Sequence, residues 1–350
     1  MIRINAGTWL LLLCAIPVVG AMAQAEPDHD DPGVSDYIRY VEDDSDGSSR
    51  LQTSITRFSL GDTTVDLVAV VHLADADYYR NLDAYLTRYE AVLYELVGGQ
   101  YRAQAPEETS EAGGAGEIAG VRGLQSMAQS LLGLELQLEH INYEAPNFVH
   151  ADVDWDQYEE LMEARNQSFT TIFSRAMMMA DAGQIGGIST DEESLSLMFG
   201  QLLGAITTGD SAGLKRTIAP FLSEAEGFIT QLEGDDGTVL VSERNKVVMA
   251  KIAEVMGGDT TNVAVFYGAG HMPDLESRLL AAGFAKGETT WADAWLLPAA
   301  TSGGNTVEGS APASPADIMI NLLQQNPEMM NVIKEVSEAL EAIQNLQDEE

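Results

Sequence analysis

VAVVHLAD at residues 68–75 and YGAGHMPD at residues 267–274 are the two stretches that decide the fold. In each stretch an apolar, strand-like run leads to a histidine, and an amphipathic, helix-like segment follows. Open α/β sheets place their ligands at the carboxyl ends of strands, just before the helices begin. We therefore expect His72 and His271 to converge on one site, although they lie far apart in the sequence.

The pattern around these stretches predicts an α/β fold, with a mixed sheet flanked by helices. Residues 67–71 and 91–97 are continuous apolar runs apart from one glutamate, as expected of strands covered on both faces. A helix expected at 77–88 connects them, which predicts a right-handed βαβ unit. Further strands are expected at 51–60, 147–153, 262–267 and 289–297.

The remaining domain organisation follows from changes in periodicity and composition. From about 155 to 256 the apolar spacing is almost wholly helical, which predicts a large all-helical insertion within an α/β domain at 51–297. Residues 298–315 are rich in Ser, Gly, Ala and Pro and are expected to be a linker. Residues 316–350 are expected to form a C-terminal helical extension, through which the chain could form a homo-oligomer.

The first residues have the features of a secretory signal peptide. Arg3 precedes a short apolar run at 8–19, and AMA at 21–23 is a small-x-small cleavage pattern. We expect a signal peptide at 1–23, a flexible acidic lead-in at 24–50, and an exported protein that is periplasmic or secreted. Cys14 is the single cysteine and lies in the apolar run, so the mature protein is expected to have no thiol or disulfide chemistry.

The charge of the chain restricts its partners. There are 18 basic and 55 acidic residues, which give a net charge of −37. Such a surface repels nucleic acid and anionic lipid, so we expect neither as a partner. We also expect no membrane span in the mature chain, because no later segment is long and apolar enough. Solubility explains this charge, and attraction of cations or basic peptides is the alternative.

Glu95 and Arg244 are the charged residues that we expect beside the two histidines. Glu95 is the sole charge in the apolar run at 91–97, and a buried carboxylate needs a metal, an arginine or a hydrogen-bond network. Two imidazoles and a carboxylate are suitable ligands for a divalent metal ion such as manganese, cobalt or zinc, which would activate a bound water. The predicted metal ligands are thus His72, His271 and Glu95. The alternative is a Glu95–Arg244 ion pair without metal.

His150 is a secondary candidate. It ends the predicted strand in FVHAD at 148–152 and is followed by a carboxylate, so it could face the same site. A packed histidine bonded to Asp152 or Asp154 explains the same pattern equally well.

Taken together, these motifs resemble those of the TraB/PrgY/TIKI (GumN-like) family, which is related to erythromycin-esterase-like and ChaN-like proteins. That family has two G-x-x-H motifs, a glutamate on the strand after the first, and an Arg-Asn helix before the second. The resemblance covers about 51–297. The corresponding stretches here are AVVH at 69–72, YEL at 94–96, ERN at 243–245 and GAGH at 268–271. The chain departs from the family at Ala69, where glycine is usual.

The resemblance implies an exported metal-dependent hydrolase of the peptidase type, acting on a peptide or small molecule. In that reading Glu95 is a metal ligand or general base, and Arg244 steadies the oxyanion or a substrate carboxylate. Asn245, beside Arg244 in the matched motif, is a secondary site candidate. Two alternatives are a non-catalytic protein that binds a peptide or small ligand, as in pheromone shut-down, and a haem- or iron-binding protein like the ChaN-like relatives.

Overall fold

A computed structural model describes residues 36–98, 132–167, 210–234 and 237–299, together with 171, 172, 175 and 179. The predicted signal peptide, most of the linker, the C-terminal extension and part of the helical insertion lie outside the described residues. The predictions made for those segments stay predictions.

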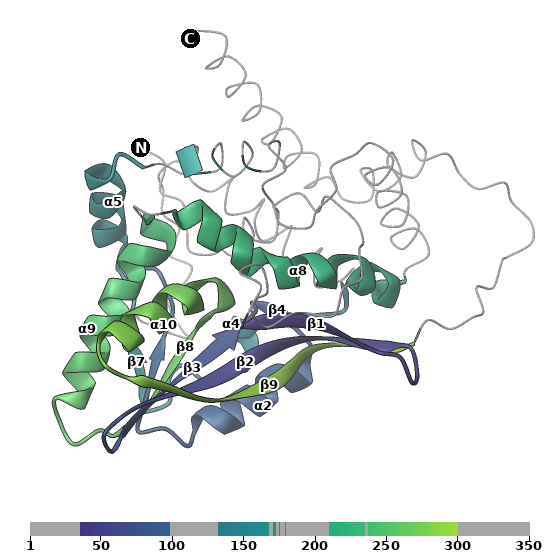
Figure 1. The fold of residues 1–350 in the computed structure, drawn as a ribbon, viewed down its shortest axis with the longest axis horizontal. Coiled ribbons are helices and arrows are strands. Elements are labelled where there is room, and N and C mark those ends of the chain that lie inside the picture. The colour runs from purple at the N-terminus through teal and green to yellow at the C-terminus, as the bar shows by residue number, and fades with distance from the viewer. Residues whose placement is uncertain are drawn as a thin grey trace, which may run out of the picture.

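A mixed sheet of seven strands forms the centre of the fold (Figure 1). The strand order is β1-β2-β3-β8-β5-β7, and β9 pairs with β2. The strands are β1 (Ile38–Asp43), β2 (Ser48–Leu60), β3 (Thr63–Val70), β5 (Ala91–Tyr94), β7 (Phe148–His150), β8 (Asn262–Gly268) and β9 (Ala285–Leu297). With helices on its faces, this sheet confirms the predicted α/β class.

Helices surround the sheet, with α8 above it and α2 below it in the view of Figure 1. The helices are α2 (Ala76–Leu86), α4 (Gln137–His140), α5 (Trp155–Ala164), α8 (Ser211–Glu233), a π-helix η1 (Val239–Glu243), α9 (Arg244–Met256), a 3₁₀-helix η2 (Ala269–His271) and α10 (Met272–Ala281). A second, two-stranded sheet joins β4 (Leu73–Ala74) to β6 (Glu135–Leu136). The helices α5, α8 and α9 lie in the range predicted for the insertion.

The sheet begins earlier than predicted. The sequence suggested a flexible lead-in at 24–50, but β1 and the start of β2 lie within that range. β1 pairs antiparallel with Ser48–Thr53 of β2, and this pairing stabilises a segment whose composition is that of a loop. A second difference concerns β5, which ends at Tyr94, so Glu95 follows the strand instead of lying within it.

The core of the sheet consists of parallel strands with apolar side chains on both faces. β3 pairs with β8, β8 with β5 and β5 with β7, all in parallel. Every residue of β5 is buried, and so are Val263 to Gly268 of β8. This two-sided burial is what the continuous apolar runs predicted.

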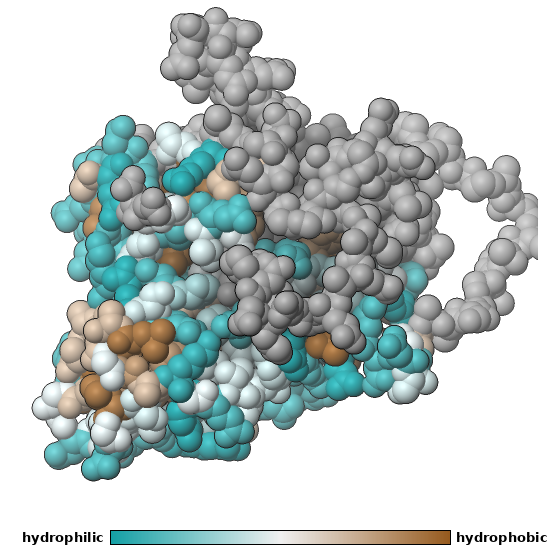
Figure 2. Space-filling view, viewed as in Figure 1, coloured by the Kyte–Doolittle hydropathy of each residue, from teal (hydrophilic) through white to brown (hydrophobic). Residues whose placement is uncertain are grey.

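The outer surface agrees with the acidic composition. Hydrophilic residues cover most of the described part of the face shown in Figure 2. In the described ranges, the large apolar side chains that are exposed are Leu60, Leu138, Leu280 and Leu296. None of the helices within those ranges combines the length and apolar character needed to cross a bilayer.

Candidate functional site

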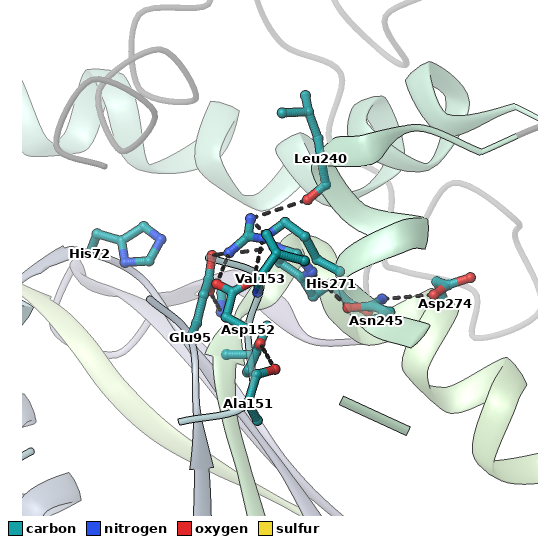
Figure 3. A network of polar contacts seen from close by, with 12 residues as sticks. His72, Glu95, Ala151, Asp152, Val153, Leu240, Asn245, His271 and Asp274 are labelled. Atoms are coloured by element: carbon teal, nitrogen blue, oxygen red, sulfur yellow. Dashed lines mark hydrogen bonds and ion pairs between the residues drawn. The ribbon is translucent and has the colours of Figure 1, made fainter. Parts of the chain in front are cut away.

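The carboxyl ends of four parallel strands bring the candidate residues to one edge of the sheet (Figure 3). His72 lies two positions beyond β3, and Glu95 directly follows β5. Asp152 lies two positions beyond β7, and His271 ends η2 after β8. The structure therefore gathers residues that are separated by up to 199 positions in the sequence.

Arg244, the first residue of α9, lies at the centre of this group. Its Nε and Nη2 donate to the two carboxylate oxygens of Asp152 at 2.9 and 2.7 Å. Nη2 also donates to Glu95 Oε1 at 2.6 Å, while Nη1 donates to the Leu240 carbonyl at 3.1 Å and to His271 Nε2 at 3.2 Å. A guanidinium has five N–H donors, and here all five are used. Arg244 therefore connects the parts of the site and has no donor left for a ligand in this arrangement.

The cluster is buried and carries a net negative charge. The side chain of Asp152 is 0% exposed, that of Arg244 9% and that of Glu95 13%. Burial by itself would raise the pKa of Glu95, but the charge of Arg244 and the nearby His271 outweigh it and hold that pKa well below its usual range. Burial lowers the pKa of Arg244, yet Asp152 and Glu95 raise it well above normal. Two carboxylates and one guanidinium leave a charge of −1.

His271 is held in one orientation by Asn245. The Asn245 amide nitrogen donates to the His271 carbonyl at 3.0 Å and to Asp274 Oδ2 at 2.7 Å. Its amide oxygen therefore faces His271 Nδ1, at 2.8 Å, and accepts a hydrogen bond from the N–H group of that nitrogen. Nε2 is then the nitrogen that faces Arg244 Nη1, at 3.2 Å. The secondary candidate Asn245 thus belongs to the site.

His72 faces the cluster from the other side, with its ring directed toward Glu95 (Figure 3). Its Nδ1 is 2.7 Å from Gln137 Oε1. A Cβ placed on Gly268 would lie 3.4 Å from His72 Nε2 and 3.3 Å from Glu95 Oε2, so both acceptors border this glycine. Burial lowers the pKa of His72, and the negative charge of Glu95 opposes this shift only in part.

Both glycines of the GAGH motif have a steric role. The backbone N–H of Gly268 donates to Glu95 Oε2 at 2.8 Å, and its missing side chain leaves room for His72. A Cβ on Gly270 would lie 2.5 Å from Ile229 Cδ1 of α8, so this glycine lets α8 approach the site closely. Ala69, the departure from the family pattern, is fully buried within β3.

The structure does not join His150 to the cluster. Its Nε2 lies 2.7 Å from the Leu96 carbonyl, and its ring packs edge-on against Tyr94. His150 is therefore a packed histidine at a strand end, with a backbone partner instead of the expected Asp152 or Asp154.

Two site residues were not recognised in their observed roles from the sequence. Asp152 was considered only as a partner of His150, whereas it binds Arg244 through both carboxylate oxygens. Asp152 follows β7 closely, as Glu95 follows β5. A carboxylate shortly after a predicted strand was therefore the feature of the sequence that could have identified it. Gln137 had no signal, because it lies in a short segment whose pairing is set by tertiary structure.

The predicted metal ligands do not form a ready metal site in this arrangement. Both His72 and His271 are bonded through Nδ1, the orientation that metal-binding histidines adopt. However, the guanidinium of Arg244 is bonded to both Glu95 and His271, where an ion would have to bind. Across the described ranges, one group of three or more His, Cys, Asp or Glu side chains has ligand atoms all within 4.8 Å of one another, and it consists of Glu135, Glu139 and His140.

No family model matches the chain, and no match is found among curated proteins or among solved structures. The resemblance to the TraB/PrgY/TIKI family therefore rests on the sequence motifs alone.

We predict that Gly268→Ala disturbs the site sterically. The added methyl group would lie 3.3 Å from Glu95 Oε2, which is tighter than an ordinary contact, so Glu95 has to move by a few tenths of an ångström away from its bonds to Gly268 and Arg244. We expect a loss of about 1–3 kcal/mol in the free energy of unfolding, measured by urea denaturation.

Gly227→Ala in α8 is the matched control, since a Cβ there meets nothing within 4 Å. It should stabilise the protein by about 0.5–1 kcal/mol through helix propensity. Equal effects of the two variants would contradict the steric role of Gly268.

We predict that the stability contributed by ionised Glu95 is lost in acid. Because its folded-state pKa is lowered, this contribution is fully present above the unfolded value of about 4.5 and disappears as the pH falls through the folded pKa. Wild type should therefore be more stable than Glu95→Gln at pH 7, and the difference should shrink below about pH 4.5. Urea denaturation at stepped pH measures this difference.

Glu254→Gln serves as the control for the acid experiment, because the side chain of Glu254 is 68% exposed and forms only a surface pair with Lys251. Its stability should follow that of wild type at every pH. A Glu95→Gln difference that stays constant with pH would contradict the prediction.

Proposed function

We propose that this protein is a hydrolase of peptide or related acyl bonds, with His72 as its general base. One observation carries the proposal: His72 Nε2 borders Gly268 at the edge of the sheet, next to the ionised Glu95. Among the residues that the structure describes, no donor is bonded to this nitrogen. The resemblance to the TraB/PrgY/TIKI family supports a peptide as the substrate class.

In this proposal His72 takes a proton from a water molecule as that water attacks the acyl carbon. The protonated ring then gives this proton to the leaving amine or alcohol as the acyl bond breaks. The lowered pKa of His72 keeps the ring unprotonated, and so available to accept a proton, at neutral pH. The net charge of −1 in the adjoining cluster stabilises the imidazolium that forms. Arg244 contributes indirectly, because its bonds hold the carboxylates of Glu95 and Asp152 in place and its charge lowers the pKa of Glu95.

The sequence predicted a metal-dependent form of this reaction, with manganese, cobalt or zinc. The observed arrangement does not fit an ion bound by all three predicted ligands, since His271 Nε2 is bonded to Arg244. The chemistry proposed above therefore uses only the side chains of the chain. Export to the periplasm or beyond the cell is part of the proposal and rests on the predicted signal peptide.

Non-catalytic binding of a peptide or small ligand is the second candidate. It is favoured by the complete use of the Arg244 donors, because Arg244 then has no N–H group left for a reacting oxyanion. A ligand that is retained intact after long incubation supports this candidate. Haem or iron binding, the third expectation, is tested by absorbance near the Soret region after haem is added.

We predict that His72→Ala lowers kcat about 100- to 10,000-fold, the contribution expected of a general base. The measurement is hydrolysis of a peptide and ester panel by the mature protein. His150→Ala is the matched control, since His150 bonds a backbone carbonyl outside the cluster, and it should keep wild-type kcat. Equal activity of wild type and His72→Ala would remove His72 from the mechanism.

Metal dependence is tested by metal content and chelation. The arrangement around Arg244 predicts that hydrolysis survives dialysis against EDTA and that the protein holds far less than one metal equivalent by mass spectrometry. One equivalent in wild type, its absence from a His72→Ala/His271→Ala double variant, and recovery of activity with manganese, cobalt or zinc would establish the metal-dependent form instead.

A further inference from the structure

We propose that Gln137 is a positioning residue of this site, which sets the tautomer and the orientation of the His72 ring. The expected effect of Gln137 on the rate of hydrolysis rests on the function proposed above. Its expected effect on the tautomer of His72 does not depend on that function.

Strand pairing places Gln137 directly opposite His72. In the small antiparallel sheet, Leu73 of β4 pairs with Leu136 of β6, and Ala74 pairs with Glu135. The same register, continued by one residue, sets His72 across from Gln137. The Gln137 backbone N–H donates to the His72 carbonyl at 3.1 Å, which confirms that the register continues. Gln137 therefore contacts His72 through both its main chain and its side chain.

The side-chain amide of Gln137 has a defined direction. Gln137 is 4% exposed, and its amide nitrogen lies 2.7 Å from the Tyr143 hydroxyl, to which it donates. The amide oxygen therefore faces His72 Nδ1 at 2.7 Å. Because an amide oxygen only accepts hydrogen bonds, the proton of the neutral ring must be on Nδ1. Nε2 is then left as the acceptor that faces the site.

The second histidine has the same arrangement. Asn245 Oδ1 accepts from His271 Nδ1 at 2.8 Å, as Gln137 Oε1 accepts from His72 Nδ1. Each ring is thus fixed by a neutral amide, which sets the tautomer without adding charge. A carboxylate in either place would instead favour the protonated ring. Asn245 was expected from the sequence motif, and Gln137 is its structural counterpart.

The backbone around His72 is held independently of the Gln137 side chain. The Tyr79 hydroxyl donates to the Val71 carbonyl at 2.7 Å, and the Trp295 indole N–H donates to the Leu73 carbonyl at 2.7 Å. Removal of the Gln137 amide should therefore release the ring while the strand end keeps its place. This separation makes the role of the side chain testable.

The test uses the full mature chain labelled with ¹⁵N-histidine, which gives few signals because the whole sequence has five histidines. His72→Gln identifies the signals of His72. At neutral pH we expect wild type to show a protonated Nδ1 and an unprotonated Nε2. Gln137→Met, which is similar in size but lacks the amide oxygen, should shift the signals toward the Nε2–H form. Gln137→Glu keeps an acceptor oxygen and should keep the proton on Nδ1.

The kinetic readout accompanies the spectra. We expect Gln137→Met to lower kcat on the order of 10- to 100-fold with little change in KM, as for other residues that orient a functional histidine. Gln52→Met is the control, because Gln52 bonds Arg39 and Asp293 on the outer part of the sheet. It should change neither the spectra nor kcat, and the His271 signals should stay constant in every variant.

An unchanged His72 tautomer in Gln137→Met would overturn the proposal, whatever the activity. A changed tautomer with wild-type kcat would overturn the positioning role. If wild type hydrolyses nothing, the proposed function fails, and a changed tautomer in Gln137→Met still supports the assignment of Gln137 to the orientation of His72.

Discussion

The ion-pair cluster around Arg244 is the constraint on which the rest of the site depends. One guanidinium forms ion pairs with two carboxylates, Asp152 and Glu95, that follow different strands of the sheet. Removal of one partner from such a buried pair leaves an uncompensated charge, which costs about 3–5 kcal/mol. The strand ends and the start of α9 are therefore fixed relative to one another. This rigidity allows two histidines from distant parts of the chain to face one carboxylate.

The helical segment before α9 supports Arg244 from outside the sheet. η1 is a π-helix, a form that is often found at functional sites, and its Leu240 carbonyl accepts from Arg244. The buried Glu233 at the end of α8 accepts from backbone and hydroxyl groups of Thr238 and Ser242, which secures the turn that leads into η1. The segment from the end of α8 to α9 is thus part of the site, because it holds Arg244, the cation on which the cluster depends.

The repeated histidine motif combines a ring for the site with an aspartate for the scaffold. Asp75 accepts from Lys215 of α8 and from the backbone N–H of Leu296, and thereby links α8 and β9 to the end of β3. Asp274 accepts from Asn245, which in turn orients His271. The aspartates are consequently not ligands of the site in either motif. Their hydrogen bonds fix the helices and strands that carry His72 and His271.

The sequence by itself determined the α/β class and the convergence of His72, Glu95 and His271, because continuous apolar runs specify buried parallel strands whose carboxyl ends share one edge. It could not determine that β1 starts the sheet at Ile38, since that segment is stabilised by pairing with β2 and not by its own composition. Only the tertiary structure decided that Asp152 binds Arg244, and that Gln137 lies opposite His72. The tertiary structure also decided where Arg244 lies. Its ion pairs with the buried carboxylates depend on distances of a few ångströms, and the spacing of residues along the chain does not encode such distances.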